Sequence, residues 1–461
     1  MPVHAVYMFQ QVEYRAIPFV QWMLRLPNMS KIMHRQKLVG TKAAKLLILG
    51  LYSIWFLIVI LGVGLMVWDK YTIIATILLI TSPVLSITAI VLLMSIARSL
   101  IVSPKEKRLQ SNSQKILSKH PAKIIAVAGS YGKTTMKELL ATVLSEKYDV
   151  AATKGNMNTL VGHARFSAGL SGKEDVLVME YGEGKPGDVA RFAQNSQPDY
   201  AIITGLAPNH LDAYKTLDNL AKDILSLRQY VSNENILITE DSDLLQKFIE
   251  PTDHLFSSKR VDGWLIANIK INFEGTAFDM KKADSVMHIA SKLLGRHQVA
   301  PLAAAASLAI KLGLTERQVE SGLARTEPFE HRMSPYIVSG AQIVDDTYNG
   351  NLEGSLAGIA LLRELSAKRR IYVTPGLVEQ GSQKHFVHQK IAKALISAKP
   401  DIVVLMKNSS TAIIEDYLNN NNFNGELKIE TNPLGFYQNI EHFVAKGDLV
   451  VMQNDWTDNY S

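Results

Sequence analysis

The chain begins with two long apolar stretches that are separated by a short polar turn. Residues 46–68 and 72–97 carry no charged side chain, and only Asp69, Lys70 and Tyr71 lie between them. A membrane-spanning helix needs about 20 apolar residues, so both stretches are long enough to form a transmembrane hairpin. A buried hairpin in a soluble core is the alternative, although helices this long and this apolar are rare there. A cleaved signal peptide fits less well, because the first stretch starts late and a second follows it.

Basic residues on both sides of the stretches predict their orientation. Four precede the first stretch and four follow the second: Arg35, Lys37, Lys42, Lys45, Arg98, Lys105, Lys107 and Arg108. Cytoplasmic flanks are enriched in Lys and Arg, so both ends of the hairpin are expected in the cytoplasm, with everything after residue 98. Residues 1–40 mix aromatic and basic side chains. They suit either an amphipathic helix at the membrane interface or a short lead-in that becomes helical.

Beyond a polar stretch at 100–120, which predicts a linker with a short helix, strand-like and helix-like runs alternate. The strand-like runs are 124–128, 176–180, 200–204, 235–239, 342–345, 371–374, 402–406 and 448–452. This alternation predicts an α/β fold with mostly parallel sheets. Residues 262–290 instead show the short alternation of antiparallel strands. We predict three parts: a membrane-anchoring region with its linker at 1–120, a central domain at 121–330 and a C-terminal domain at 331–461.

Charge and cysteine content narrow the possible functions. The net charge is +6 and no cysteine is present. A basic balance is typical of proteins that bind nucleic acid or anionic membranes. Much of this excess lies beside the apolar stretches, which favours the membrane. The lack of cysteine excludes disulfides, thiolate metal sites and a cysteine nucleophile.

A glycine loop with the sequence AVAGSYGKTT follows the first strand of the central domain and precedes a helical segment at 136–146. In such a loop, backbone N–H groups and the helix N-terminus bind an anion. Lys133 would reach the β- and γ-phosphates of a nucleotide, and the Thr134 hydroxyl would bind Mg²⁺. Val127 stands where the usual loop has its first glycine, so Gly129 and Gly132 enclose a tighter turn. The alternative is a glycine turn with an exposed lysine.

Polar residues follow the next two strands. Glu180 ends the first of them, and His210 follows the second. Carboxyl ends of parallel strands face the ligand side of a sheet, so both are candidate Mg²⁺ ligands, although each alone is more often structural. Lys222 lies on the next predicted helix beside Asp223, where a solvated helix face is the simpler interpretation. Arg332, near the expected domain junction, is either a surface charge or an arginine that points at a transferring phosphoryl group.

Several of these motifs, in order from about residue 121 to 395, resemble the Mur ligase family. The matching segments are GSYGKTTMKELL, GNMNTLVG, MEYGEGKPGD, NHLDAYKTLDNLAKDI, LLGRHQVAPLAAAAS, HRMSPY, IVDDTYNGNLEGS and TPGLVEQGSQKHFVHQKI. They are most similar to the branch that adds D-alanyl-D-alanine to a muramyl tripeptide. The resemblance implies a P-loop-type central domain and a Rossmann-like C-terminal domain. In place of the family's UDP-binding domain we expect the membrane hairpin.

The resemblance also implies roles for individual residues. Lys133 and Thr134 match the family's phosphate and Mg²⁺ residues, Glu180 and His210 match its other Mg²⁺ ligands, and Lys222 matches a lysine that the family carbamylates. The residues expected to hold ATP are Gly129, Ser130, Tyr131, Gly132, Lys133, Thr134, Thr135, Gln298, Arg332, Asp346, Tyr348 and Asn349. Lys133, Lys222, His210 and Arg332 would take part in catalysis. Gln298 departs from the family, which has Asn there, so contacts to the base are expected to differ.

The implied reaction is ATP-dependent and Mg²⁺-dependent amide formation through an acyl phosphate. The expected substrates are D-alanyl-D-alanine and a muramyl peptide, either UDP-linked or lipid-linked. Three alternatives stay open: a ligase of the same family with another amine or acceptor, a membrane-anchored ATP-binding scaffold of cell-wall synthesis, and a P-loop ATPase that drives transport. Two spans are too few for a transport pathway in one chain. No nucleic-acid partner is expected.

Overall fold

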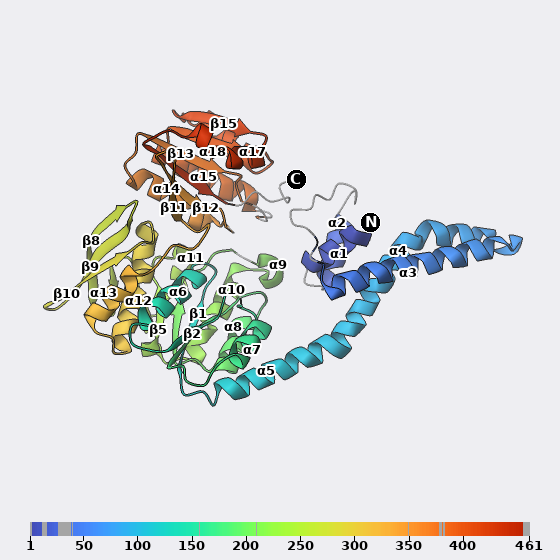
Figure 1. The fold of residues 1–461 in the computed structure, drawn as a ribbon, viewed down its shortest axis with the longest axis horizontal. Helices are drawn as coiled ribbons and strands as arrows, with labels where there is room; N and C mark the ends of the chain where they lie inside the picture. Colours follow the sequence, from blue (N-terminus) through green and yellow to red (C-terminus); the bar gives the residue numbers. More distant parts are fainter. Residues whose placement is uncertain are drawn as a thin grey trace. The chain divides into compact units, whose positions relative to one another are not determined.

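A computed structural model describes residues 2–11, 16–25, 38, 40–155, 157–208, 210–348, 350–377, 380 and 383–454. The chain forms two compact units, Met1–Leu109 and Gln110–Ser461. The predicted boundaries at 120 and 330 stay predictions. Figure 1 shows the helical first unit and the α/β second unit.

The first unit is a helical hairpin with two short helices beside it. Helix α3 (Lys42–Met66) is capped by the Thr41 side chain, and a 3₁₀ turn at Asp69–Tyr71 leads into α4 (Thr72–Ala97). The helices approach closely where a Cβ added to Gly62 would lie 2.7 Å from Leu79 Cδ2. Helices α1 (Pro2–Gln11) and α2 (Ala16–Arg25) pack against α3 and α4 through a small core: Ala5, Val6, Phe9, Phe19, Ala44, Leu51, Ile87 and Ile90.

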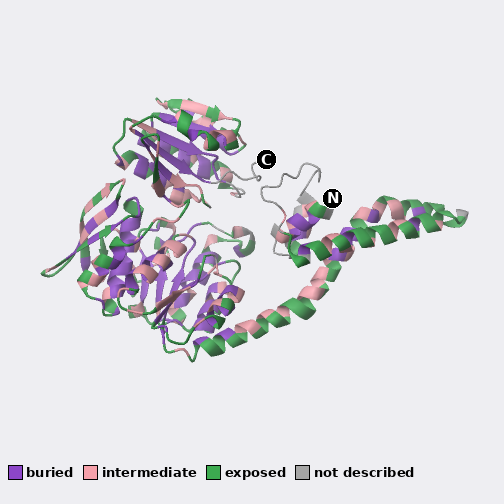
Figure 2. Cartoon of the chain, viewed as in Figure 1, coloured by how far each residue is buried: buried purple, intermediate pink, exposed green. Residues whose placement is uncertain are grey.

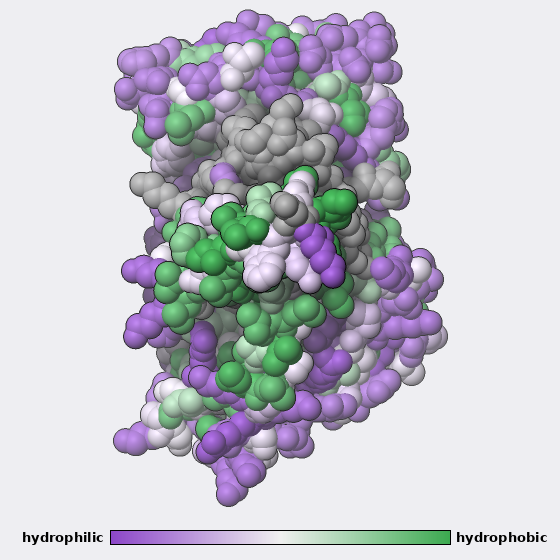
Figure 3. Space-filling view, turned by 90° about the vertical axis from the view of Figure 1, so that its right-hand side faces the viewer, coloured by the Kyte–Doolittle hydropathy of each residue, from purple (hydrophilic) through white to green (hydrophobic). Residues whose placement is uncertain are grey.

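Most of the hairpin's apolar side chains face outward. Leu57, Leu61, Ile73 and Ile80 are among the exposed ones, and Figures 2 and 3 show the hairpin as largely exposed and hydrophobic. A soluble core helix would bury such side chains. By length and composition, the described residues contain two helices able to cross a membrane, Ala44–Met66 and Thr72–Leu117.

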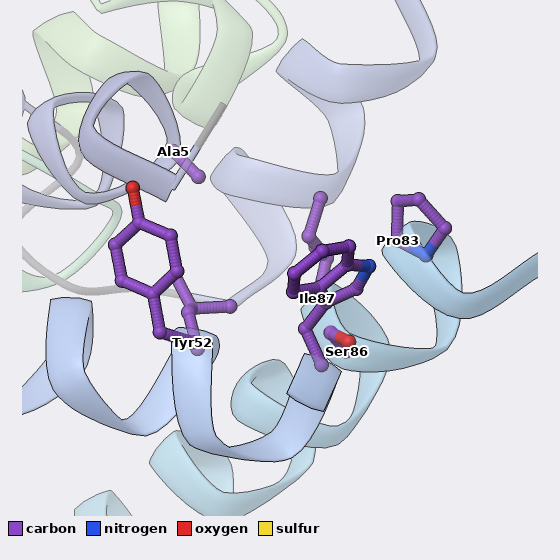
Figure 4. Close-up of a pocket in the computed structure, with 7 residues that line it drawn as sticks. Ala5, Tyr52, Pro83, Ser86 and Ile87 are labelled. Carbon is purple, nitrogen blue, oxygen red and sulfur yellow. The ribbon is translucent and has the colours of Figure 1, made fainter. Parts of the chain in front are cut away.

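Pro83 interrupts the backbone hydrogen bonds of α4 and lines a small apolar cavity. Pro83 cannot donate to the Leu79 carbonyl, and Ser82 Oγ donates to that carbonyl instead at 2.8 Å. The Trp55 indole N–H in turn donates to Ser82 Oγ at 3.2 Å. Beside this point lies a cavity of about 230 Å³, shown in Figure 4 and lined by Ala5, Leu51, Tyr52, Trp55, Pro83, Ser86 and Ile87.

The polar stretch after the second span is more helical than the sequence suggested. A π-helical turn at Arg98–Val102 continues α4 directly into α5 (Ser103–Leu117). The predicted helix is present but longer than expected, since helix runs without a break from residue 72 to 117. The run SPKEKRLQSNSQKIL contains no glycine, and its only proline, Pro104, lies just after the π-helical turn.

The second unit contains a ten-stranded sheet in the order β10-β9-β8-β7-β6-β5-β4-β1-β3-β2. Its strands are β1 (Lys123–Ala128), β2 (Val150–Ala152), β3 (Val176–Glu180), β4 (Tyr200–Ile203), β5 (Ile236–Thr239), β6 (His254–Phe256), β7 (Arg260–Val261), β8 (Trp264–Asn272), β9 (Gly275–Lys282) and β10 (Ser285–Ser291). Strands β1 to β6 pair in parallel, and β6 to β10 pair antiparallel. This confirms the predicted change of strand type near residue 262.

Side chains that alternate along β1 bury both faces of this sheet. Ile125 and Val127 pack with α6 (Lys133–Leu144), α12 (Val299–Lys311) and α13 (Glu316–Ala324). Ile124, Ala126 and Ala128 pack on the other face with α8 (Asp188–Ser196) and α10 (Leu217–Ile224). Two buried faces explain why the parallel strands read as continuous apolar runs.

A second sheet has the order β11-β12-β16-β13-β14-β15. Its strands are β11 (Ser334–Val338), β12 (Ala341–Asp346), β13 (Arg369–Thr374), β14 (Ile402–Met406), β15 (Glu426–Glu430) and β16 (Asp448–Gln453). Among the described strands of this second sheet, only the β11–β12 pair is antiparallel. Helices α14 (Leu352–Glu364), α15 (Lys384–Ala398) and α16 (Thr411–Asn420) pack on one face, and α17 (Pro433–Gln438) and α18 (Ile440–Phe443) on the other.

Candidate active site

The glycine loop joins β1 to α6 in the predicted strand–loop–helix order. Gly129 has a φ of 136° and Gly132 a φ of 73°, values that side-chain-bearing residues rarely adopt. Helix α6 starts directly at Lys133, three residues earlier than predicted. The first-turn N–H groups and the helix dipole therefore favour an anion at the loop.

The loop lysine is paired with a carboxylate that the sequence interpretation did not single out. Lys133 Nζ donates to Glu183 Oε1 at 3.0 Å and Oε2 at 2.7 Å, and to the Gly129 carbonyl at 2.5 Å. The Glu183 side chain is 4% exposed. The alternative of a glycine turn with an exposed lysine is therefore wrong, because Lys133 is directed into the site.

Glu180 lies at the end of β3 and gathers polar side chains from two other elements. Thr134 Oγ1 donates to Glu180 Oε2 at 3.0 Å, and Asn158 Nδ2 donates to Glu180 Oε1 at 3.2 Å. Mg²⁺ in nucleotide sites is held by one or two carboxylates together with phosphates and waters. A carboxylate and a hydroxyl beside a phosphate loop fit that ion. Among the described residues, no group of three or more His, Asp or Glu is placed to hold a metal without phosphates.

The segment after β4 supports the loop from below. Ser130 donates its N–H to the Gly205 carbonyl at 2.9 Å, and the Thr204 hydroxyl donates to the carbonyls of Ala128 and Tyr131. A Cβ added to Gly205 would overlap the Tyr131 ring. Burial raises the pKa of the Tyr131 hydroxyl. The Tyr131 ring thus packs on bare backbone and holds the middle of the loop.

The other predicted residues of the central domain lie on α9 and α10. His210, with a φ of 54°, is exposed and precedes α9 (Leu211–Tyr214). Lys222 is exposed on α10, whereas its neighbour Asp223 is buried 2.6 Å from the Tyr214 hydroxyl. Burial and Asp223 together raise the pKa of Tyr214. The structure thus brings together two of the three predicted metal ligands, Thr134 and Glu180.

Asp346 ends β12 in the second sheet and is held by hydrogen bonds. Gln453 Nε2 donates to Asp346 Oδ2 at 2.6 Å, and the Met333 N–H donates to Oδ1 at 3.2 Å. Burial raises the pKa of this carboxyl to about 7. A carboxylate at the carboxyl end of a parallel strand is well placed to meet a ligand hydroxyl.

Arg332, just before β11, packs against Tyr348, just after β12. The Arg332 guanidinium lies 4.7 Å from the centre of the Tyr348 ring, and the Tyr348 N–H donates to the His331 carbonyl. Asn349 lies outside the described residues. Gln298 is buried, with its Nε2 2.9 Å from Nε2 of His297, whose pKa burial lowers to about 4.

A polar cavity of about 180 Å³ lies along α6. Its lining comes from α6, from Leu293 and from the segment after α13: Thr135, Glu138, Leu139, Thr142, Leu293, Arg325, Thr326, Glu327 and Phe329. Thr135 is the one lining residue that also belongs to the segment 129–135.

Sequence interpretation missed Glu183, Asn158, Lys137 and Gln453. Glu183 and Asn158 lie within the segments GEG and GNMN, so the signal was a second acid and an amide close to a strand end. Lys137 looks like a surface residue of α6 by sequence, and only the structure shows it fully buried. Gln453 reaches Asp346 from a strand that lies 107 residues away in the chain.

These features define a class of protein. A phosphate-binding loop on a mostly parallel sheet, a carboxylate at the next strand end and a second α/β sheet with its own polar strand ends are typical of a nucleotide-dependent enzyme. A sequence model of the Mur ligase middle domain matches residues 127–309. This segment, which contains the phosphate loop, is thus similar to the middle domain of the Mur ligases.

Curated relatives carry one shared name. The UDP-N-acetylmuramoyl-tripeptide–D-alanyl-D-alanine ligase of Buchnera aphidicola is 27% identical over 322 residues, which cover 68% of this chain and 70% of the relative. The ligase of that name from Escherichia coli is 27% identical over 305 residues, covering 64% of this chain and 66% of the relative. The chain thus spans about two thirds of the length of these relatives.

Solved structures agree on the fold. MurF from Acinetobacter baumannii superposes with a TM-score of 0.67 at 19% identity, covering 76% of this chain and 77% of that one. MurF ligase from Thermotoga maritima in complex with ADP gives a TM-score of 0.65 at 22% identity, covering 76% and 80%. These likenesses confirm the α/β Mur ligase fold.

Proposed function

We propose that this chain is an ATP-dependent amide ligase that adds D-alanyl-D-alanine to a muramyl tripeptide. The single observation that carries the proposal is the loop at 129–135, whose lysine and threonine lie beside Glu183 and Glu180. That arrangement suits a nucleotide triphosphate with its metal ion. The names of the relatives supply the amine and the peptide acceptor.

The chemistry follows from the residues around the loop. The acceptor carboxylate attacks the γ-phosphorus of ATP, which releases ADP and leaves an acyl phosphate. The amine then attacks the acyl carbon and displaces phosphate, and it loses a proton as the amide forms. Lys133 and the loop N–H groups stabilise negative charge on the phosphoryl group. Thr134 and Glu180 would hold Mg²⁺, which neutralises phosphate charge when bound.

The remaining predicted residues receive roles in the same proposal. Arg332 and Asp346 would bind ATP from the C-terminal domain, and Tyr348 and Asn349 continue that segment. His210 would complete the metal site, and a carbamylated Lys222 would bring a further negative charge toward it.

The hairpin favours an acceptor at the membrane. Its outward apolar faces and basic flanks support a location in the cell membrane, with the ligase domains in the cytoplasm. A lipid-linked muramyl peptide would meet the ligase there without leaving the bilayer surface. Confinement to one surface raises the effective concentration of such an acceptor.

The test uses the full chain in detergent with ATP, Mg²⁺ and D-alanyl-D-alanine. UDP-linked and lipid-linked muramyl tripeptides are offered separately, and mass spectrometry detects the product. We expect more dipeptide product from the lipid-linked acceptor than from the UDP-linked one. The variant Lys133→Met should form no product from either acceptor. A faster reaction with the UDP-linked acceptor would refute the membrane part alone. ATP binding without product from either acceptor would favour another amine or a scaffold.

A further inference from the structure

Lys137 is a fully buried lysine directly behind the phosphate loop. Its side chain is 0% exposed, and it lies on α6 one turn after Lys133. Transfer of an ammonium group from water into a protein interior costs several kcal/mol unless partners compensate it. An uncharged side chain of similar length would fill the same space without this cost, so the partners of Lys137 indicate its role.

The ammonium group of Lys137 contacts oxygen atoms from three parts of the central domain. Its Nζ donates to the Thr153 carbonyl at 2.6 Å and lies 3.4 Å from the Gly155 carbonyl. It lies 3.9 Å from Glu180 Oε2 and 3.1 Å from Oε1 of Glu138. Glu138 is its chain neighbour and is 37% exposed. A pair with Glu138 alone would form at the surface, so it does not explain why Lys137 is buried.

The carbonyls that Lys137 holds begin the segment that reaches Glu180. Thr153 follows β2, and its Oγ1 accepts the Glu180 N–H at 3.1 Å. A few residues later, Asn158 donates its side-chain amide to Glu180 Oε1 and accepts the Gly182 N–H at its carbonyl. Lys137 therefore fixes the start of this segment at Thr153 and Gly155, while Asn158 at its end binds Glu180 itself.

Each carboxylate oxygen of Glu180 has a partner in this arrangement. Asn158 directs Oε1, while Thr134 and Lys137 lie at Oε2. Behind the strand end, the His163 ring donates from Nε2 to the Glu180 carbonyl at 2.8 Å. With its backbone held, the carboxylate's direction depends on Asn158, Thr134 and Lys137.

We infer that Lys137 is a positioning residue for the metal–nucleotide site. It orients the Glu180 carboxylate directly, and it orients it indirectly through the segment 153–158, without contacting the nucleotide. This inference rests on the proposed function, since it assigns Glu180 to the Mg²⁺ that accompanies ATP. Partners that orient metal ligands typically change metal affinity by about 10-fold to 100-fold when they are removed.

The experiment measures ATP binding to the full chain by calorimetry, with Mg²⁺ and with EDTA. For Lys137→Met we expect the Mg²⁺-dependent gain in affinity to fall about tenfold, while binding in EDTA, which uses Lys133 and the loop, stays near wild type. Lys173→Met is the matched control, because it makes the same substitution at an exposed lysine outside the site and should leave both values unchanged. Equal losses with Mg²⁺ and EDTA would overturn the inference and indicate a general structural role.

Two further variants separate positioning from folding. In the double variant Lys137→Met/Glu180→Gln, the Mg²⁺ response should be no weaker than in Glu180→Gln alone, because the lysine acts through that carboxylate. Additive losses would contradict this. Asn158→Ala breaks the other link to Glu180 without disturbing the buried charge, so it tests the inference even where Lys137→Met does not fold. An unchanged Mg²⁺ response in Asn158→Ala would overturn the indirect route.

The calorimetry does not depend on amide formation. A chain that binds ATP with Mg²⁺ but forms no dipeptide product refutes the proposed substrates, while Lys137 is still judged by its Mg²⁺ response. Wild-type protein without any Mg²⁺ response would refute the metal site and this inference together.

Discussion

Lys133 Nζ lies 2.7 Å from Glu183 Oε2, and the two side chains are 12% and 4% exposed. The lysine that should meet the phosphates therefore already has an anionic partner. A triphosphate must compete with Glu183 for the same ammonium group, because both carry negative oxygen atoms. The carboxylate keeps Lys133 directed into the site, and its attraction for Lys133 weakens nucleotide binding.

Replacement of Glu183 by Gln should strengthen ATP binding. An amide keeps the hydrogen bond to Lys133 but removes the competing charge. A difference of about 1 kcal/mol corresponds to about fivefold tighter binding, measured by calorimetry in EDTA. The Tm should fall, because Lys133 loses a buried charged partner. Asp218→Asn is the control, since its pair with Lys247 is exposed and such pairs contribute little. Weaker ATP binding by Glu183→Gln would show that Glu183 helps to hold the ligand.

Gly205→Ala should damage the phosphate loop from outside it. A Cβ at this position would overlap the Tyr131 ring, and its φ of 153° disfavours side chains. Overpacking of this kind typically costs about 1–3 kcal/mol, which a denaturation curve can measure, and the displaced Tyr131 should weaken ATP binding. Gly169→Ala is the control, because the nearest atom to its added Cβ lies 3.5 Å away. Normal stability and binding in Gly205→Ala would contradict the packing of Tyr131 on this residue.

The sequence predicts the strands of this fold better than its connections. Val176–Glu180 and Ile402–Met406 match their predicted ranges because both are apolar runs bounded by polar or glycine residues. The start of α6 was placed too late because Lys133, Thr134 and Thr135 look like loop residues by composition. The helix that follows Arg98 is longer than the sequence predicts, because its polar residues resemble a linker.

Site residues were predictable where a local motif carries them. Lys133, Thr134 and Glu180 follow directly from a glycine loop and a strand end. Glu183 and Gln453 act through pairs that fold together from distant segments, with 50 residues between Lys133 and Glu183 and 107 between Asp346 and Gln453. A single sequence can place Glu183 close to a strand end, but it does not show which distant side chain such a residue meets.

The raised pKa of Asp346 predicts a pH-dependent stability. Its carboxyl titrates near 7 in the folded protein and near 3.8 when unfolded. The folded state therefore binds the proton more tightly, so this residue stabilises at low pH. That contribution to the free energy of unfolding falls as the pH rises from about 4 to 7, and it stays constant above pH 7. Asp346→Asn removes this dependence.

The measurement compares the Tm of wild type and Asp346→Asn between pH 5 and pH 8.5. The variant should gain relative to wild type as the pH rises, by an amount on the order of 1 kcal/mol for this partly buried group. The comparison cancels the titration of other residues. A constant difference between the two proteins across this range would show that Asp346 titrates in the same range when folded and unfolded.

The absence of cysteine makes the membrane topology directly testable. A single cysteine introduced at Lys70, in the turn between α3 and α4, should react with a membrane-impermeant maleimide in intact cells. One at Ser111, on α5, should react only after the membrane is permeabilised. The basic flanks predict this difference because they retain both ends of the hairpin in the cytoplasm. Both positions are exposed, so full permeabilisation should label them equally and serves as the control.

Labelling of Ser111→Cys in intact cells would show that the orientation is reversed and that the phosphate loop lies away from cytoplasmic ATP. Protection of Lys70→Cys in intact cells, with extraction of the protein by alkaline buffer, would instead show that the hairpin does not cross the membrane.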